Sequence, residues 1–209
     1  NTVTETFNID VPIFAFSHCR DVVAAVSKAG GFGVLGAVGH SPDALEIDLK
    51  WIEDEVGEHP YGVDLIVPAK YEGSDEGGLT VHKIADMIPD AHHEYVTEIL
   101  EKYDVPELAE TKSGQFSMKN DGAAPMSAGT AGPQLEIALA HNPSLVVNAL
   151  GPPPQFMIDQ VKEAGRKVGA LAGKAQHAER HVNAGVDLII AQGYEAGGHT
   201  GEIGSMVLI

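Results

Sequence analysis

The sequence predicts an α/β protein built around a parallel sheet. Short apolar runs of strand length alternate with stretches whose apolar residues recur at helical spacing, as in successive βα units. Several of the short runs are apolar throughout, which is typical of strands that are covered on both faces. With 44% hydrophobic residues in 209 positions, the chain is long enough to bury one core.

The first part of the chain is expected to form three strands and two helices. Gly30 is suited to end the first helix, because glycine adopts the left-handed conformation common after a helix. Ser41 and Pro42 are the residue types of an N-cap and a first helical position, so they mark the start of the second helix. The expected elements are a strand at 11–16, a helix at 18–29, a strand at 31–37, a helix at 44–56 and a strand at 61–67.

Residues 68–133 interrupt this alternation. They contain one expected helical hairpin, at 84–103, between polar and glycine-rich segments. The segment 113–132 is expected to be a flexible loop or lid. We interpret the whole stretch as an insertion after the third strand, within a single domain that covers 1–209.

The alternation resumes after residue 133 and brings the expected number of strands to six. An eight-stranded barrel cannot close with six βα units, and an open parallel sheet would bury its strands equally well, so periodicity alone does not select a barrel. The expected elements are helix 134–141, strand 145–150, helix 154–164, strand 167–172, helix 175–184, strand 187–191 and the start of a helix at 205–209.

Charge and composition disfavour several classes of protein. The formal net charge is −17, from 13 basic and 30 acidic residues, which disfavours binding to nucleic acid or to an anionic membrane surface. Cys19 is the single cysteine, so an internal disulfide and a multi-cysteine zinc site are not expected. No apolar run approaches the roughly 20 residues that cross a bilayer, and the polar N-terminal segment lacks signal-peptide character. A soluble, cytoplasmic protein is expected.

The segment 191–201, AQGYEAGGHTG, is the strongest candidate for chemistry. It follows the last expected strand, and active sites of parallel α/β proteins are built at the carboxyl ends of strands. Gly197, Gly198 and Gly201 remove side-chain bulk, so the backbone can approach a ring system closely. His199 lies among them, and an imidazole, with an ordinary pKa of about 6.5, is suited to take a proton near neutral pH.

This segment resembles the signature loop of nitronate monooxygenases, formerly called 2-nitropropane dioxygenases. The segments 24–37, AAVSKAGGFGVLGA, and 61–65, YGVDL, resemble the first helix with the second strand, and the third strand, of the same family. The resemblance covers nearly the whole chain except 68–133. It implies a parallel (β/α)8 TIM-type barrel, FMN without a metal, and oxidation of small alkyl nitronates or nitroalkanes by dioxygen. It leaves homo-oligomerisation open.

The resemblance also implies roles for residues of the loop. His199 corresponds to the family's catalytic base, which takes the proton alpha to the nitro group or orients the nitronate. Gln192, Gly193, Gly197 and Gly198 correspond to the segment beside the flavin. The family continues with two further βα units that hold the FMN phosphate, and these are absent from this sequence, so no phosphate-binding residues are assigned.

The ends of other strands supply the remaining expected FMN contacts. Ala15, Phe16 and Ser17 lie where the first strand meets the isoalloxazine ring, although many members have Pro-Met after the alanine. Asp64 stands where many members have asparagine, and an anionic side chain there would disfavour the reduced flavin. Lys174 is either a cation near the N1–C2 carbonyl edge of the flavin or an exposed surface lysine.

Two alternatives stay open. Flavin-dependent enoyl-acyl-carrier-protein reductases have a similar Glu-x-Gly-Gly-His loop and reduce a double bond with NAD(P)H; Gln192 favours the monooxygenase. The second alternative is a non-catalytic, truncated barrel that does not hold FMN.

Other polar residues are expected to be structural. His18 is interpreted as a packing residue or a helix start. The pair 92–93 lacks the i, i+4 spacing of metal-binding helices and is expected to face solvent. His177 and His181 have that spacing but no suitably placed carboxylate, so a surface pair is expected. Glu195 is expected to hold the backbone of the glycine-rich loop.

Overall fold

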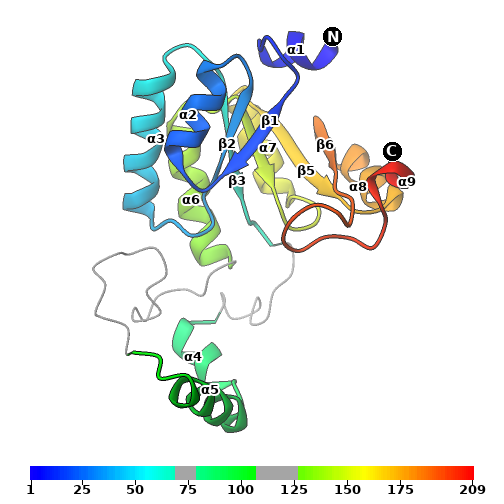
Figure 1. Ribbon diagram of the computed structural model, residues 1–209. Coiled ribbons are helices and arrows are strands. Elements are labelled where there is room, and N and C mark those ends of the chain that lie inside the picture. Colours follow the sequence, from blue (N-terminus) through cyan, green and yellow to red (C-terminus); the bar gives the residue numbers. More distant parts are fainter. Residues whose placement is uncertain (69–78, 107–126) are drawn as a thin grey trace.

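The protein, described here by a computed structural model, contains one six-stranded parallel sheet, and the structure describes residues 1–68, 79–106 and 127–209. Each strand pairs in parallel with the next one in the sequence, so the spatial order is β1-β2-β3-β4-β5-β6. The sheet is curled, with β1 and β6 as its two edges (Figure 1). The predicted α/β class and six βα strands are confirmed. The strands are β1 Phe14–Ser17, β2 Phe32–Gly36, β3 Tyr61–Leu65, β4 Leu145–Asn148, β5 Lys167–Ala172 and β6 Leu188–Ala191.

Helices cover the outer face of the sheet (Figure 1). The predicted start of the second sheet-covering helix is confirmed, because Ser41 Oγ accepts a hydrogen bond from the N–H of Ala44 at 3.2 Å and Pro42 is the first helical residue. Gly30 follows the preceding helix with φ +86°, as predicted for its end. The helices are α1 Thr2–Phe7, α2 Arg20–Lys28, α3 Pro42–Val56, α4 Val81–Asp86, α5 Asp90–Lys102, α6 Ala128–Ala140, α7 Gln155–Glu163, α8 Ala175–Ala184 and α9 Ser205–Leu208.

Helix α1 was not predicted from the sequence. Asn1 caps it, since its side chain accepts hydrogen bonds from the backbone N–H groups of Val3 and Thr4. The helix buries Phe7, whose ring packs edge-on against Phe14 and Phe32 at centroid distances of 5.2 and 5.1 Å. This contact with the sheet stabilises a helix that is too short to be stable alone.

The predicted boundary of α6 was wrong. The expected helix began at residue 134, and 113–132 was expected to be a loop; 113–126 lie outside the described residues, but 128–132 are helical. Glycine and proline in this segment favour a loop by propensity. Burial of Ala131, Leu135 and Ala138 in the core outweighs that propensity, and Pro133 lies inside the helix.

The core has two layers, one on each face of the sheet. The larger layer lies between the sheet and the outer helices, and α3 contributes Leu45, Leu49, Ile52 and Val56 to it. The smaller layer lies inside the curl and consists of Phe7, Ile9, Phe32, Val34, Leu145 and Val147. Strands β2, β3 and β4 are buried along their whole length, as their apolar runs predict. The inner face is therefore apolar, and it leads into the candidate site.

The expected hairpin at 84–103 is present as α4 and α5. Helix α5 buries none of its residues, and both helices lie apart from the sheet, on the side where β3 ends (Figure 1). The predicted insertion or lid at 68–133 stays a prediction, because 69–78 and 107–126 are outside the described residues. Among the helices of the described ranges, none is both long and apolar enough to span a bilayer.

Candidate functional site

A cavity of about 1000 Å³ opens on the inner face of the curled sheet. Side chains alternate between the two faces of a strand, and the lining residues of β1, β2 and β4 fall at every second position, whereas the edge strand β6 contributes three consecutive residues. Its walls are mostly apolar, and at the carboxyl ends of the strands, the end called the mouth here, residues of the connecting loops also line it. The strand residues that line it are Phe14, Phe16, Val34, Gly36, Asp64, Leu145, Val147, Leu171, Leu188, Ile189 and Ile190.

The loop between β6 and α9 closes one side of this mouth. The N–H of Gln192 continues the ladder of β6 by donating to the carbonyl of Ala172 at 2.9 Å. The carboxylate of Glu195 then accepts the N–H of Ser205 at 3.0 and 3.1 Å, which ties the loop's two ends together. Hydrogen bonds from its own backbone and from Ser205 lower the pKa of Glu195. The prediction that Glu195 holds the backbone of this loop is confirmed.

Five of the residues expected at the flavin site line this cavity: Phe16, Asp64, Gln192, Gly197 and His199. They come from β1, from β3 and from the loop after β6, and this loop lies more than a hundred positions after both strands in the sequence. The side chain of His199 is exposed at the mouth and faces an open cavity. The fold thus brings the candidate base beside a large apolar space.

Ala15, Ser17 and Lys174 are not among the residues that line the cavity. Ala15 and Ser17 alternate with the inward-facing residues of β1, so their side chains point to the other face. Lys174 is the exposed N-cap residue of α8, directly after the loop that follows β5. Their expected contacts with the flavin stay predictions.

Gly193 and Gly198 also lie outside the cavity lining, although both are needed by the loop. A Cβ on Gly193 would lie 2.2 Å from a carboxylate oxygen of Glu195 and 2.4 Å from Oγ of Ser205. Gly198 has φ +77°, a conformation that favours glycine. These two glycines shape the turn that presents His199, and their contacts with a flavin remain predictions.

Asp64 is a buried acid in the cavity wall. It pairs with Gly36 in the β2–β3 ladder, and the residue is only 8% exposed. Burial raises the pKa of its carboxyl group to about 7. A large share of the molecules therefore carries a neutral carboxylic acid here at neutral pH, and this form can donate a hydrogen bond as an asparagine amide can. The expected conflict between a negative charge at this position and a reduced flavin is correspondingly smaller.

His18 is a cavity residue that the sequence analysis set aside. Its Nδ1 lies 2.9 Å from the carbonyl oxygen of Gly36, and its ring meets Phe16 edge-on at 5.0 Å. A Cβ on Gly36 would lie 2.5 Å from Cζ of Phe16 and 2.7 Å from Nδ1 of His18, so both rings depend on the glycine. The sequence signal that could have found His18 is the alternation of side chains along β1, since residues 14, 16 and 18 all face the cavity.

The expected surface pair of His177 and His181 was wrong. His181 is 1% exposed, and its Nε2 donates to the carbonyl of Leu171 at 2.9 Å, which ties α8 to β5. The pair at 92–93 is exposed on α5, as expected. Within the described part of the chain, no group of three or more histidine, cysteine, aspartate or glutamate residues is placed to hold a metal ion.

Buried amides hold the loops around the mouth, and the sequence analysis did not find them. Asn148 accepts the N–H of Val67 at 2.8 Å and donates to the carbonyl of Leu150 at 3.1 Å. Gln134 donates through Nε2 to two carbonyls of the loop at 37–40. Because buried polar groups are costly when unpaired, these bonds fix the loops after β2, β3 and β4.

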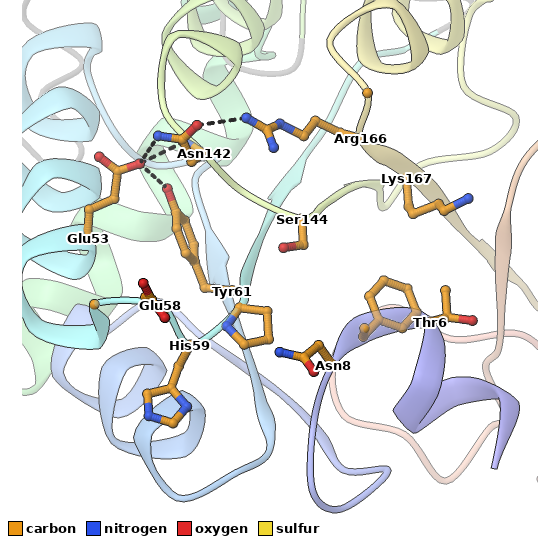
Figure 2. A pocket seen from close by; sticks show the side chains of 14 residues that line it. Thr6, Asn8, Glu53, Glu58, His59, Tyr61, Asn142, Ser144, Arg166 and Lys167 are labelled. Carbon is orange, nitrogen blue, oxygen red and sulfur yellow. Dashed lines mark hydrogen bonds between the residues drawn. The ribbon is translucent and has the colours of Figure 1, made fainter.

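A second cavity, of about 540 Å³, lies at the other end of the sheet, where β3, β4 and β5 begin (Figure 2). Glu53 accepts the hydroxyl hydrogen of Tyr61 at 3.1 Å and the N–H of Asn142 at 2.7 Å. Arg166 donates to the side chain of Asn142 at 2.7 Å. These polar groups largely satisfy one another, and the amino-terminal end of such a sheet usually serves stability. The cavity inside the curl is therefore the better candidate site.

Comparisons with known proteins agree with this geometry. The sequence model of the family described as nitronate monooxygenase matches residues 3–209. The chain is 48% identical over 207 residues to a putative monooxygenase, Rv1533, of Mycobacterium tuberculosis, covering 99% of this chain and 54% of that protein. It is 30% identical to a probable nitronate monooxygenase of Staphylococcus saprophyticus, covering 95% of this chain and 50% of that protein. The chain thus spans about half the length of the curated relatives it matches.

Solved structures show the same fold. FabK from Thermotoga maritima matches with a TM-score of 0.64 and 22% identity, over 99% of this chain and 48% of that one. A nitroalkane oxidase from Streptomyces ansochromogenes matches with a TM-score of 0.65 and 23% identity, over 96% and 51%. The six strands described here thus have the arrangement found in part of those chains.

Proposed function

The chain belongs to the nitronate monooxygenase family, and from this we propose that it serves FMN-dependent oxidation of alkyl nitronates or nitroalkanes with dioxygen. The observation that carries the proposal is the position of His199. It stands on a glycine-rich loop at the carboxyl ends of the strands and faces an apolar cavity. A base at the border of an apolar space is suited to remove a proton from carbon, because the apolar part of a small carbon acid can bind in that space beside the imidazole.

The cavity supports a flat aromatic cofactor. Its apolar walls include Phe16, Leu171 and Ile190, and a Cβ on Gly197 would meet nothing within 4 Å, so there is open space against the loop. Gln192 offers an amide that can both donate and accept hydrogen bonds. Bound there, FMN would supply the redox chemistry, taking electrons from the substrate and passing them to dioxygen.

The residues of the chain supply binding and proton transfer in this proposal. His199 accepts the proton alpha to the nitro group of a neutral nitroalkane, or orients a nitronate that is already formed. The apolar walls would contact the alkyl part of the substrate, and the uncharged form of Asp64 offers a hydrogen bond without adding negative charge. A positioned base of this kind contributes about 10²–10⁴ in rate.

The test is a comparison of two substrates in FMN-loaded protein. His199→Asn is expected to slow turnover of neutral 1-nitropropane about 10²-fold or more, and turnover of preformed propyl-1-nitronate much less. His177→Asn, on α8 and away from the cavity lining, is the control and should leave both rates unchanged. Equal losses on the two substrates in His199→Asn would reject the role of His199 as a base.

A second candidate is NAD(P)H-dependent reduction of an enoyl thioester. The observation that favours it is the depth of the apolar wall, which runs from Val3 and Phe14 to His199 and offers space for an acyl chain beside a flavin. Rapid anaerobic bleaching of the flavin by NADH or NADPH would favour this reductase. A purified protein that is colourless and stays colourless with added FMN would instead support a non-catalytic barrel.

A further inference from the structure

A second imidazole borders the mouth of the cavity. His18 follows β1 directly, and His199 follows β6. Because β1 and β6 are the two edges of the sheet, the imidazoles line the same cavity from opposite edges. The proposed reaction assigns a role to His199 alone, so His18 is a cavity residue without one.

The ring of His18 is held in one orientation. Its Nδ1 lies 2.9 Å from the carbonyl oxygen of Gly36, and because a carbonyl only accepts, Nδ1 carries a hydrogen. The edge-on contact with Phe16 holds the ring from another side. In the described part of the chain, Nε2 of His18 has no hydrogen-bond partner. One nitrogen is therefore fixed to the sheet, and the other is available to a ligand.

The cavity needs a positive charge if its ligand is an anion. None of the described residues that line it is lysine or arginine, and the side chains there that can become cationic are His18 and His199. A base must be neutral before it takes a proton, so His18 is the cavity side chain that can carry a positive charge before proton transfer to His199. An anion that enters an apolar cavity without a partner pays a large desolvation cost.

We propose that His18, protonated on both ring nitrogens, is a substrate-binding residue whose Nε2–H pairs with the anionic oxygen of the nitronate. The proposal rests on the proposed function for the identity of the anion. It makes His18 the recognition group and His199 the base, with Gly36 as the backbone group that orients His18. A neutral substrate would gain less from His18 than its conjugate anion does.

Binding of an unreactive anion tests this without turnover. Propanoate has the shape and charge of a small nitronate, and propanamide is its neutral counterpart. In FMN-loaded protein, calorimetric titration between pH 5.5 and 8.5 should show propanoate binding tighten as the pH falls, with little change for propanamide. His18→Asn and His18→Gln should weaken propanoate about tenfold at pH 6 and flatten its pH dependence, while propanamide is unaffected.

Two other titratable side chains face this cavity, Asp64 from β3 and His199 from the loop after β6, so each needs its own control. In Asp64→Asn and in His199→Asn, propanoate binding should still tighten as the pH falls, because both variants keep His18. The KM for propyl-1-nitronate should rise about tenfold in His18→Asn, with kcat changed less than threefold. Unchanged flavin content in the variant would show that the fold is retained. The comparison of propanoate with propanamide in wild-type protein tests the proposal without any variant.

The outcomes separate this inference from the proposed function. If wild-type protein binds propanoate and propanamide alike at every pH, or if both His18 variants bind propanoate as wild type does, the role of His18 is overturned. If the His18 variants lose propanoate but wild-type protein does not oxidise nitronates, the anion site stands and the proposed reaction is wrong.

Discussion

Nδ1 of His141 lies 2.9 Å from a carboxylate oxygen of Glu53, and this contact joins the end of α6 to α3. On its other side, Nε2 of the same ring lies 3.0 Å from Glu46. Burial alone would lower the pKa of His141, but the hydrogen bonds to the two carboxylates outweigh it, and the pKa is raised. Burial would likewise raise the pKa of Glu53, but hydrogen bonds from His141 and from the backbone of Asn142 outweigh it, and the pKa is lowered.

These directions predict a stability that depends on pH. A raised pKa for His141 means that its contribution is fully present below the unfolded value of about 6.5 and is lost as the pH rises through the folded value. A lowered pKa for Glu53 means that its contribution is present above about 4.5 and is lost as the pH falls. His141→Gln should therefore lower the free energy of unfolding most near pH 5.5 and less at pH 8.5. The loss near pH 5.5 should be about 1 kcal/mol, because Glu46 is largely exposed. Urea unfolding at the two pH values measures this; an equal cost at both would contradict it.

Asp64 predicts a pH dependence of stability opposite to that of Glu53. Its pKa is raised to about 7 by burial, so the folded state holds a proton that the unfolded state has released, and stability falls as the pH rises from about 4 to 7. Asp64→Asn removes this penalty and should raise the free energy of unfolding by about 2–4 kcal/mol at pH 8. At pH 4 the gain should vanish, because the wild-type group is then protonated in the folded state. Urea unfolding of both proteins decides this, and a variant that is less stable at both pH values would contradict it.

The sequence predicted elements best where their boundaries are local. Helix α8 and strand β5 were predicted to the residue, since Gly173 separates them and Gly185 ends the helix with φ +88°. Helix α1 was missed because its stability depends on the packing of Phe7 against rings of β1 and β2. The start of α6 was missed because burial outweighed propensity. These stabilising contacts are distant in the sequence, so local patterns do not reveal them.

The candidate site likewise contains residues that a local sequence pattern reveals and residues that only tertiary contacts reveal. His199 was found because glycines surround it within one segment, which is a local signal. His18 was missed because its role depends on Gly36 in the next strand, and only the strand register places the two together. His181 was expected at the surface, but its bond to Leu171 becomes visible only when α8 packs on β5. Local sequence patterns thus predicted the candidate loop with His199, and the tertiary structure added His18 on the opposite side of the cavity.

Gly36 gives a prediction about the packing of Phe16 and His18 in the cavity wall. A Cβ there would lie 2.5 Å from Phe16 and 2.7 Å from His18, so Gly36→Ala should displace both rings and destabilise the protein by about 1–3 kcal/mol. Gly132→Ala is the matched control, because Gly132 lies within α6 with nothing within 4 Å of an added Cβ. The control should be stabilising by about 0.5–1 kcal/mol, since alanine favours a helix. Urea unfolding compares them, and a Gly36 variant as stable as wild type would show that the rings have room to move.

The link between Glu195 and Ser205 gives a prediction about the loop that carries His199. Glu195→Ala removes the acceptor of the Ser205 N–H, so the loop's two ends keep only the backbone bond from the N–H of Tyr194 to the carbonyl of Ile203, at 2.9 Å. Because Glu195 is exposed, global stability should change little, while hydrogen exchange at Ser205 should become faster and turnover of 1-nitropropane should fall about tenfold or more, as expected when a base is displaced. Glu202→Ala is the control, since Glu202 is an exposed acid of the same loop with no hydrogen bond among the described residues. Turnover that is equal in the two variants would mean that this tie does not position His199. A fall in turnover without faster exchange would place the effect of Glu195 in the chemistry, where its carboxylate would act on the substrate directly.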